Sequence, residues 1–438
     1  MSQRPNILFM HSHNTGRYVQ PYGFDVPTPN LQRLAEQGVL FRQAFAAAPT
    51  CSPSRASLLT GQCPHSSGML GLAHRGFSLN DPKQLLTHTL RAAGYTTVRA
   101  GLQHVTKTNE RSERHLGYDT TLKPRSIYAP DVVPGAVAYL DSQPKQPFFL
   151  DVGIFETHTP FPEQPAEQAR YTSVPMNLPD HPQIRQDFAN FKAHARTMDD
   201  GYGALLDALD RNGLAENTLV ICLADHGLQF PYGMCNLTDA GLETYFILRG
   251  PGGCTGGKVI DAIISHVDVF PSVCELAGID APDWLQGTSV LPLVSGDVES
   301  LHDEIFGEVT YHAAYEPMRC VRTKRYKYIK RYDGREHPVL TNLDPGLSRD
   351  AMLDLGIAEQ RRWQEGLFDL MFDPHERDNR IADPALAGVL EDLRSRLDSW
   401  MQRTDDPILN GLPVQAPSGA ILNDPDGFVH MEQPTVVP

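Results

Sequence analysis

The sequence lacks long hydrophobic runs. A membrane-spanning helix needs about 20 consecutive apolar residues, and no stretch of the 438-residue chain approaches that length. The first apolar run, residues 7–10, is also too short for the core of a secretion signal. We therefore expect a cytoplasmic protein that makes no contact with membranes.

Paired cysteines are missing as well. The seven cysteines are scattered along the chain, and no two of them form a Cys-x-x-Cys arrangement. Because their number is odd and they are scattered, these cysteines are not expected to form a set of disulfide bonds. The lack of Cys-x-x-Cys argues against a structural zinc site.

The sequence is also short of positive charge. It has 38 Lys and Arg residues against 53 Asp and Glu residues, which gives a formal net charge of -15. An acidic surface repels nucleic acid phosphates, so we expect no nucleic acid partner. An anionic substrate would then need a local cluster of positive charge or a bound metal ion.

Strands and helices alternate over the first 300 residues. This alternation is typical of βαβ units and predicts an α/β fold, with a large mixed, mainly parallel sheet sandwiched by helices. The expected strands are residues 7–10, 39–47, 95–100, 148–154 and 218–224, and the expected helices are residues 28–38, 52–61, 86–94 and 195–213.

The pattern changes near residue 300. Residues 319–331 are basic and alternate in polarity, which predicts one or two antiparallel strands with a solvated face. Residues 385–402 have the apolar spacing of an amphipathic helix. We expect a catalytic domain over 1–300, an α+β subdomain with a small antiparallel sheet over 301–405, and an irregular tail over 406–438. Such a tail is compatible with a homodimer.

An eleven-residue segment, from Cys51 to Gly61, carries the strongest chemical signal. It reads Cys-Ser-Pro-Ser-Arg-Ala-Ser-Leu-Leu-Thr-Gly and is predicted to begin a helix. A nucleophile at a helix N-terminus lies among free N–H groups, which favour negative charge. Arg55 lies one turn further on the same face and can hold the nucleophile or an anionic oxygen. A lone cysteine at such a place is otherwise an ordinary buried side chain.

Polar residues follow two of the predicted strands. His13 and Asn14 come after the first strand, and Asp225 and His226 come after strand 218–224. A carboxylate and an imidazole at the carboxyl end of a strand, such as Asp225 and His226, can both reach one divalent ion. A pair such as Asp225-His226 alone would also be consistent with a simple polar turn.

The segment from Cys51 to Gly61 resembles the sulfatase signature C-x-P-S-R-x-x-x-L-T-G at every fixed position. Further segments at 68–72, 317–319 and 372–379 are similar to the sulfamidase-like subgroup of that family. The resemblance implies an alkaline-phosphatase-like fold and conversion of Cys51 to formylglycine, the nucleophile. It also implies a divalent metal ion, calcium in most members, and a small anionic substrate such as a sulfated sugar.

The chain departs from the family pattern at the metal site. Sulfatases usually carry a metal-binding Asp-Asp pair where this chain has His13 and Asn14, so the resemblance implies an ion held by His13, Asn14, Cys51, Asp225 and His226. The exchange makes the predicted ligand set softer and less anionic, so manganese and zinc become candidates beside calcium.

Histidines and cations near other strand ends complete the expected site. The resemblance assigns proton transfer to His158 first and His104 second, because a histidine titrates near neutral pH. Leu102 stands in place of a family lysine, and Lys107 is the nearest substitute. We expect His65, Lys107 and Arg319 to contact the substrate.

Three alternatives remain open. The first is a phosphonate or phosphate ester hydrolase of the same superfamily. The second is a binding protein that kept the fold and lost activity. In the third, unmodified Cys51 acts as a metal ligand or as a thiolate nucleophile.

Overall fold

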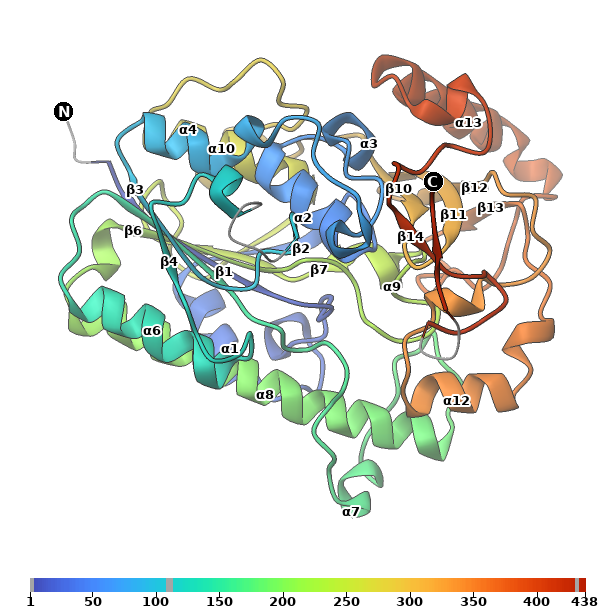
Figure 1. Ribbon diagram of the computed structural model, residues 1–438, viewed down its shortest axis with the longest axis horizontal. Helices are drawn as coiled ribbons and strands as arrows, with labels where there is room; N and C mark the ends of the chain where they lie inside the picture. Colours follow the sequence, from blue (N-terminus) through green and yellow to red (C-terminus); the bar gives the residue numbers. More distant parts are fainter. Residues whose placement is uncertain (1–3, 108–112, 430–432) are drawn as a thin grey trace.

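The computed structural model describes residues 4–107, 113–429 and 433–438, and its largest element is a nine-stranded sheet (Figure 1). The strand order is β4-β3-β5-β1-β6-β8-β2-β7, with β9 paired to β2. Neighbours from β4 to β6 are parallel, as are β2 and β9, whereas β8 and β7 run antiparallel to their partners. The strands are β1 (Asn6–Ser12), β2 (Val39–Phe45), β3 (Thr96–Gly101), β4 (Thr120–Leu122), β5 (Phe148–Gly153), β6 (Thr218–Ala224), β7 (Glu243–Thr244), β8 (Phe246–Arg249) and β9 (Lys258–Ser265).

Helices cover both faces of this sheet, as Figure 1 shows. One face carries α2 (Cys51–Thr60), α4 (Leu86–Ala92) and α10 (Val269–Ala277), and the other carries α1 (Pro29–Gln37), α6 (Ala129–Asp141) and α8 (Pro182–Arg211). Because helices cover them on both sides, β1 and β6 are buried along their whole length. Such strands read as continuous apolar runs. The predicted α/β fold class is confirmed.

Helix α8 begins earlier than expected. The sequence predicts a helix over 195–213, whereas α8 starts at Pro182, where the His181 side chain accepts a hydrogen bond from a backbone N–H of the first turn. Proline is well suited to the first helical position because its missing N–H needs no partner there. The added turns pack on α12 (Leu347–Asp354), away from the main core.

A second, smaller sheet follows residue 300, also as expected. It is antiparallel with the order β10-β11-β12-β13, and α13 (Ala387–Arg403) packs on one of its faces. Its other face packs against loops and strands of the large sheet. The strands are β10 (Glu304–Tyr311), β11 (Tyr315–Thr323), β12 (Tyr326–Arg331) and β13 (Glu365–Asp369). The domain boundaries at 300 and 405 stay predictions.

The expected solvated face of residues 319–331 is wrong. Arg319 and Lys327 have no exposed surface, because both faces of the small sheet are covered. The cations are instead paired with buried carboxylates. Arg322 and Lys327 both bind Asp239, the first residue of α9 (Asp239–Leu242). In residues 319–331, the alternating polarity therefore reflects cations that form buried ion pairs and not a face exposed to solvent.

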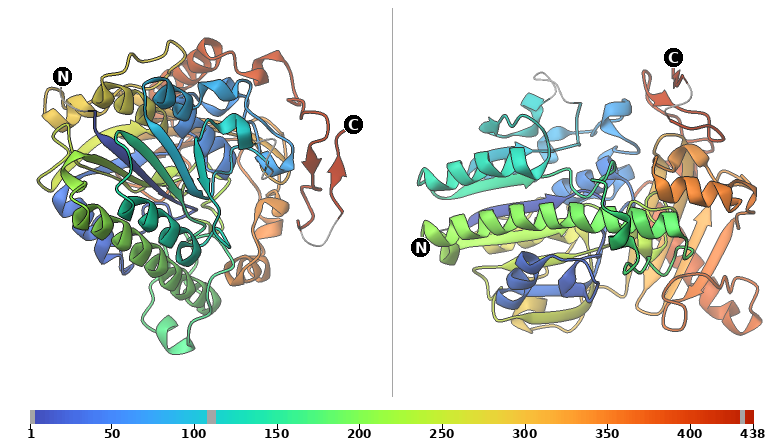
Figure 2. Two further views of the ribbon diagram at one scale, coloured as in Figure 1. Left: turned by 60° about the vertical axis from the view of Figure 1, so that its left-hand side comes forward. Right: turned by 90° about the horizontal axis from the view of Figure 1, so that it is seen from below.

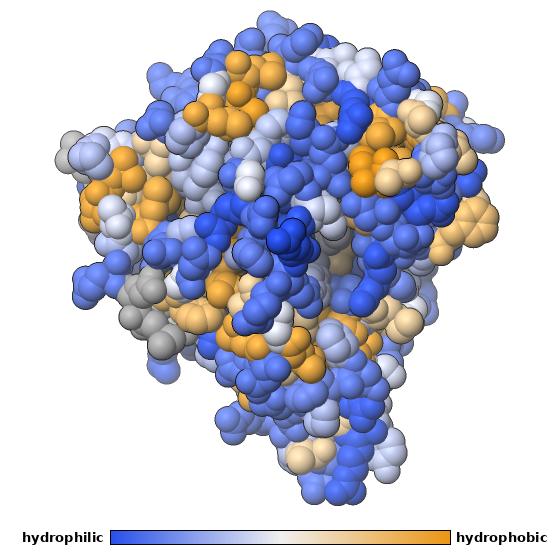
Figure 3. All heavy atoms as spheres, turned by 90° about the vertical axis from the view of Figure 1, so that its right-hand side faces the viewer, coloured by the Kyte–Doolittle hydropathy of each residue, from blue (hydrophilic) through white to orange (hydrophobic). Residues whose placement is uncertain are grey.

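Two short strands near the C-terminus, β14 (Ile421–Leu422) and β15 (Thr435–Val436), pair in antiparallel orientation and lie at the edge of the molecule in the left view of Figure 2. On the face shown in Figure 3, apolar residues form separate patches among hydrophilic ones.

None of the helices within the described ranges is long and apolar enough to cross a membrane. Further short α-helices in the described ranges are α3 (Pro64–Ser67), α7 (Ala166–Ala169) and α11 (Leu291–Ser295).

The buried ion pairs of Asp239 should contribute strongly to stability. Asp239→Asn leaves Arg322 and Lys327 buried with one negative charge fewer, so the free energy of unfolding should fall by roughly 3–5 kcal/mol. Urea denaturation measures this. Asp180→Asn, which removes an exposed ion pair with Arg185, is the control and should change little. A variant at Asp239 as stable as this control would contradict the structural role.

Candidate active site

Two loops meet at the carboxyl ends of β1 and β6. The strands pair in parallel, with Ser12 opposite Ala224 at their ends. The two loops therefore begin side by side. The loop after β1 begins with His13 and Asn14, and the loop after β6 begins with Asp225 and His226. The backbone N–H of Asn14 donates a 2.8 Å hydrogen bond to Asp225 Oδ1, which ties the two loops together.

Cys51 completes a buried cluster with these residues. Its Sγ is 2.9 Å from His13 Nε2 and 3.5 Å from His226 Nε2, and His13 Nε2 is 3.5 Å from Asp225 Oδ2. These four ligand atoms all lie within 4.8 Å of one another. Asn14 Oδ1 is 3.9 Å from Cys51 Sγ. The structure thus brings all five predicted metal ligands together.

Helix α2 brings Cys51 to this place. Cys51 is the first residue of α2, and all ten residues of the helix are buried. The first backbone N–H groups of a helix have no partner inside it, so residue 51 lies where negative charge is favoured. Gly61 ends the helix with φ of 67°, a conformation that glycine adopts without strain.

Arg55 is engaged differently from the expectation. Its guanidinium donates to Asp225 Oδ2 at 3.1 Å, to the backbone oxygen of Ser12 at 3.1 Å, and to His11 Nδ1. We expected Arg55 to hold the nucleophile or a substrate oxygen. In the structure it holds the Asp225 carboxylate and His11 in place.

The charges of the cluster follow from its burial. Burial opposes ionisation of Asp225, but His226, Arg55 and backbone N–H groups together hold its pKa below the usual value. Burial lowers the pKa of His13 well below its usual value and also lowers the pKa of His226. At neutral pH the site therefore contains a carboxylate, a guanidinium and two neutral imidazoles.

This donor set fits a divalent transition-metal ion. Bonds of about 2.0–2.3 Å at a tetrahedral angle place ligand atoms about 3.3–3.8 Å apart. Four of the separations between these ligand atoms are 2.9, 3.5, 3.5 and 3.9 Å. Calcium takes six to eight oxygen ligands, whereas Asn14 and Asp225 supply the side-chain oxygens of this cluster. The imidazole nitrogens of His13 and His226 are ligands that zinc and similar ions prefer, and which ion is bound stays a prediction.

His158, the first candidate for proton transfer, lies beside the cluster. Its ring is 4.8 Å from that of His13, centroid to centroid, and stacks on Phe155. Its Nε2 is 3.7 Å from Asp344 Oδ2, and its side chain is 22% exposed. His158 is therefore close to the cluster and also reachable from solvent.

His104, the second candidate, is held by another histidine. Its ring is 5.6 Å from that of His13, and its Nε2 is 3.1 Å from Nδ1 of the exposed His74. Burial, followed by the charge of His74, holds the pKa of His104 well below its usual value. A neutral imidazole at neutral pH suits a hydrogen-bonding role better than that of a general acid.

Four site residues were not predicted: His11, Asp151, His74 and Asp344. His11 Nε2 and Asp151 Oδ1 are 2.7 Å apart and both are buried. An isolated carboxylate in the apolar run 148–154 was the available signal for Asp151. His74, in the short 3-10 helix Ala73–Arg75, and Asp344, in a loop, come from distant parts of the sequence, and nothing in the local sequence distinguishes them.

His65 and Arg319 lie in a separate buried cluster. His65 Nδ1 is 2.7 Å from Glu308 Oε2, and Arg319 Nε is 2.5 Å from Asp406 Oδ2 and 3.2 Å from Glu308. Neither side chain is more than 1% exposed, so this placement does not favour the predicted contacts with substrate. Lys107 is exposed, and its role stays a prediction.

Comparison with known proteins shows the family of the chain. A family model described as Sulfatase matches residues 5–279, and one described as N-sulphoglucosamine sulphohydrolase, C-terminal, matches residues 234–347. The chain belongs to the sulfatase family, as the segment from Cys51 to Gly61 predicts.

Similar proteins match over most of their length. An ulvan-active sulfatase of Formosa agariphila is 30% identical, over 96% of this chain and 85% of that protein. The N-sulphoglucosamine sulphohydrolase of Homo sapiens is 28% identical, over 90% and 88%. The crystal structure of phosphonate monoester hydrolase of Agrobacterium radiobacter shares the fold, with a TM-score of 0.71 at 19% identity over 92% of this chain and 96% of that one.

The ion pair of His65 predicts a pH dependence of stability. Burial lowers the pKa of His65, but Glu308 and Cys63 outweigh it and raise the pKa to about 11. The unfolded chain releases this proton near pH 6.5, so the stabilisation is complete below about pH 6.5 and is lost as pH rises toward about 11. His65→Gln should therefore destabilise the protein most in mild acid.

Urea denaturation between about pH 6 and 10 tests this expectation. The difference in free energy of unfolding between the natural protein and His65→Gln should shrink as pH rises. The exposed His337, changed to Gln, is the control. A constant difference across this range would show that His65 is not protonated in the folded state.

Proposed function

We propose that the protein is a metal-dependent sulfatase that hydrolyses a sulfate ester or sulfamate of a carbohydrate, with residue 51 as a formylglycine nucleophile. The position of Cys51 carries the proposal. It begins α2, inside the cluster of His13, Asp225 and His226, so the attacking atom lies among the metal ligands. The names of the relatives, an ulvan-active sulfatase and an N-sulphoglucosamine sulphohydrolase, support a sulfated carbohydrate as substrate.

The surroundings of Cys51 disfavour an unmodified thiolate as the nucleophile. Burial, followed by the charge of Asp225, raises the pKa of the Cys51 thiol well above its usual value. A protonated thiol is a weak nucleophile, so unmodified Cys51 is poorly suited to attack. A hydrated aldehyde at this position would supply a hydroxyl group at the N-terminus of α2 without needing a thiolate.

Each neighbouring residue has a role that its contacts support. A bound divalent ion would polarise the sulfate group. Asp225 and His226 would hold that ion, while Arg55 fixes the Asp225 carboxylate. His158, with Nε2 toward Asp344 and 22% of its side chain exposed, would give a proton to the leaving oxygen or nitrogen.

We infer that the ion is zinc or a similar first-row transition metal. Two imidazole nitrogens favour such ions over calcium. His226 Nδ1 also lies 3.1 Å from the backbone oxygen of Gly227, the kind of contact that orients a histidine ligand. Homodimer formation and a cytoplasmic location stay predictions.

The nucleophile is tested by Cys51→Ala. Turnover of sulfated substrates should be abolished and the thermal unfolding midpoint should stay nearly unchanged, because residue 51 is placed for chemistry. Cys51→Ser should be almost as damaging, since an alcohol cannot expel sulfate by returning to an aldehyde. Cys222→Ser, at another buried cysteine, is the control for the cysteine change itself.

Mass spectrometry of the natural protein shows whether the Cys51 thiol has been replaced by an aldehyde. An unmodified thiol in fully active enzyme would rule out formylglycine. A panel of sulfate, phosphate and phosphonate aryl esters separates a sulfatase from a phosphonate hydrolase of the same fold. Equal turnover in Cys51→Ala would place the reaction elsewhere.

The metal is tested by elemental analysis. The purified protein should contain about one transition-metal ion per chain, held by the cluster of residue 51 and Asp225. Asp225→Asn should lose most of it, because it removes the cluster's one carboxylate. Asp187→Asn, at a buried carboxylate bonded to Ser348, should keep it. Stoichiometric calcium, or full occupancy in Asp225→Asn, would contradict the assignment.

A further inference from the structure

A cavity of about 340 Å³ lies outside the active site, between the start of β10 and the end of α13. Its wall includes Phe306 and Trp400, whose rings stack with their centroids 4.8 Å apart. Gln286 and Arg403 also line it, and both are exposed, so the cavity reaches the surface of the molecule. Its volume is within the usual range for a ligand pocket.

Cys63 lines this cavity, beyond the end of α2 that lies opposite residue 51. Helix α2 has ten residues, so about 15 Å of helix separates the two cysteines. Cys63 is 6% exposed and packs with the apolar residues under α13. Its thiol is therefore separate from the active site and borders a space that small molecules can enter.

Two polar side chains lie against the sulfur of Cys63. His65 Nε2 is 3.5 Å from Cys63 Sγ, and Ser66 Oγ is 3.1 Å from it. Gln286 Nε2 donates a 2.9 Å hydrogen bond to Ser66 Oγ, which leaves the hydroxyl hydrogen of Ser66 for another neighbour. The sulfur of Cys63 is nearer to that hydroxyl than the backbone oxygen of Thr404, at 3.5 Å. Both neighbours can therefore stabilise negative charge on the sulfur.

His65 carries a positive charge beside this sulfur. Its Nδ1 is 2.7 Å from Glu308 Oε2. Burial opposes the charge of His65, but Glu308 and Cys63 outweigh burial and raise its pKa to about 11. A cation next to a cysteine favours the thiolate, which is the form that attacks electrophiles. The arrangement of Cys63, His65 and Glu308 thus has the parts of an activated nucleophile.

Other cysteines of the core lack this arrangement. Cys254 and Cys274 are at most 1% exposed, and burial raises the pKa of each thiol to about 11. Neither thiol forms a hydrogen bond with a histidine in the part of the chain that the structure describes. These two cysteines therefore provide an internal comparison for Cys63.

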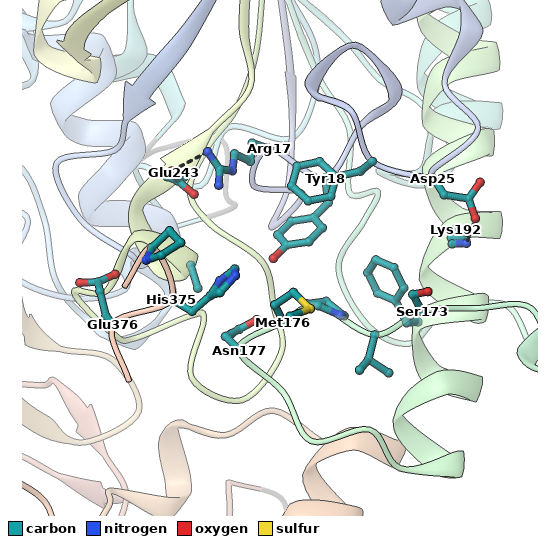
Figure 4. Close-up of a pocket in the computed structure, with 16 residues that line it drawn as sticks. Arg17, Tyr18, Asp25, Ser173, Met176, Asn177, Lys192, Glu243, His375 and Glu376 are labelled. Carbon is teal, nitrogen blue, oxygen red and sulfur yellow. Dashed lines mark hydrogen bonds and ion pairs between the residues drawn. The ribbon is translucent and has the colours of Figure 1, made fainter. Parts of the chain in front are cut away.

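Another cavity, of about 280 Å³, shows the contrast (Figure 4). Its cations already have partners, since Arg17 pairs with Glu243 at 2.7 Å and Lys192 pairs with Asp25 at 2.7 Å. No cysteine is among the described residues that line it. That cavity offers ion pairs, whereas the cavity at Cys63 offers a thiol with a charged neighbour.

A metal ion is the other ligand that these side chains could take. Ligand atoms of Cys63, His65 and Glu308 lie within 4.8 Å of one another. However, Arg319 Nε is only 3.2 Å from Glu308 Oε2, so a second cation would be repelled there. His65 would also have to lose the proton that Glu308 stabilises. The surroundings therefore favour reaction at the sulfur over metal binding.

We propose that Cys63 is a modification site, where hydroperoxides that enter this cavity oxidise the thiol to a sulfenic acid. The sulfur attacks the terminal oxygen of the hydroperoxide, so that an S–O bond forms and the O–O bond breaks. The leaving oxygen takes the electron pair of the broken bond and a proton from His65, which regains one from solvent. Sulfur is oxidised, and the hydroperoxide is reduced to water or an alcohol. This reaction is independent of the proposed sulfatase activity.

Trapping of the sulfenic acid tests the proposal. The natural protein is treated with hydrogen peroxide and dimedone, which labels sulfenic acids, and mass spectrometry then measures the label at each cysteine. Cys63 should be labelled at least about tenfold faster than Cys254 and Cys274. His65→Gln should slow the labelling of Cys63 about tenfold, because glutamine carries no charge to stabilise the thiolate.

His337→Gln, at an exposed histidine, is the matched control and should leave the rate at Cys63 unchanged. Faster labelling of Cys254 and Cys274 would reveal any unfolding of His65→Gln. Ser66→Ala removes the other neighbour without removing a buried charge, and it should also slow the labelling of Cys63. Equal labelling of Cys63 and Cys254 in the natural protein, or an unchanged rate at Cys63 in Ser66→Ala and His65→Gln, would overturn the proposal. Labelling of Cys63 that appears only after a metal chelator is added would also overturn it, in favour of a metal site.

Discussion

The active site depends on one buried carboxylate, that of Asp225. Its oxygens accept hydrogen bonds from the backbone N–H groups of Asn14 and His226 at 2.8 and 2.9 Å, and from Arg55 Nε at 3.1 Å. These bonds join the loop after β1, the loop after β6 and helix α2. A buried carboxylate is stable only with such partners, so Asp225 and its three neighbours fix one another. Because Arg55 belongs to α2, its bond to Asp225 also fixes residue 51, the first residue of that helix.

The charge of the site explains how it can attract a sulfate group. Where most sulfatases have two carboxylates, this chain has His13, a neutral imidazole, and Asn14. The remaining pair, Asp225 and Arg55, carries opposite charges and sums to zero. The charge of a divalent ion would therefore remain largely uncompensated and available to the anionic substrate. The chain lacks the family's active-site lysine at position 102, and the ion can supply the positive charge that the lysine provides elsewhere.

The sequence predicted the parts of the structure that depend on local pattern. Apolar runs marked β1 and β6, and the polar residues after them lie together as candidate metal ligands because parallel strands align their carboxyl ends. What could not be predicted depends on contacts between distant residues. The basic pattern of 319–331 was interpreted as solvated because nothing near Arg319 in the sequence shows that Asp406 lies against it. Arg55 was assigned to the substrate for the same reason, since its bonds to Asp225 and His11 form only in the folded chain.

The central claim is that residue 51, His13, Asp225 and His226 bind one transition-metal ion. X-ray diffraction from crystals of the protein, recorded on both sides of the zinc absorption edge and at the edges of neighbouring metals, locates such an ion directly. The account predicts a single strong anomalous peak within bonding distance of His13 Nε2, His226 Nε2 and an Asp225 oxygen. An ion surrounded by oxygens alone, or a peak elsewhere with these side chains unbound, would contradict it.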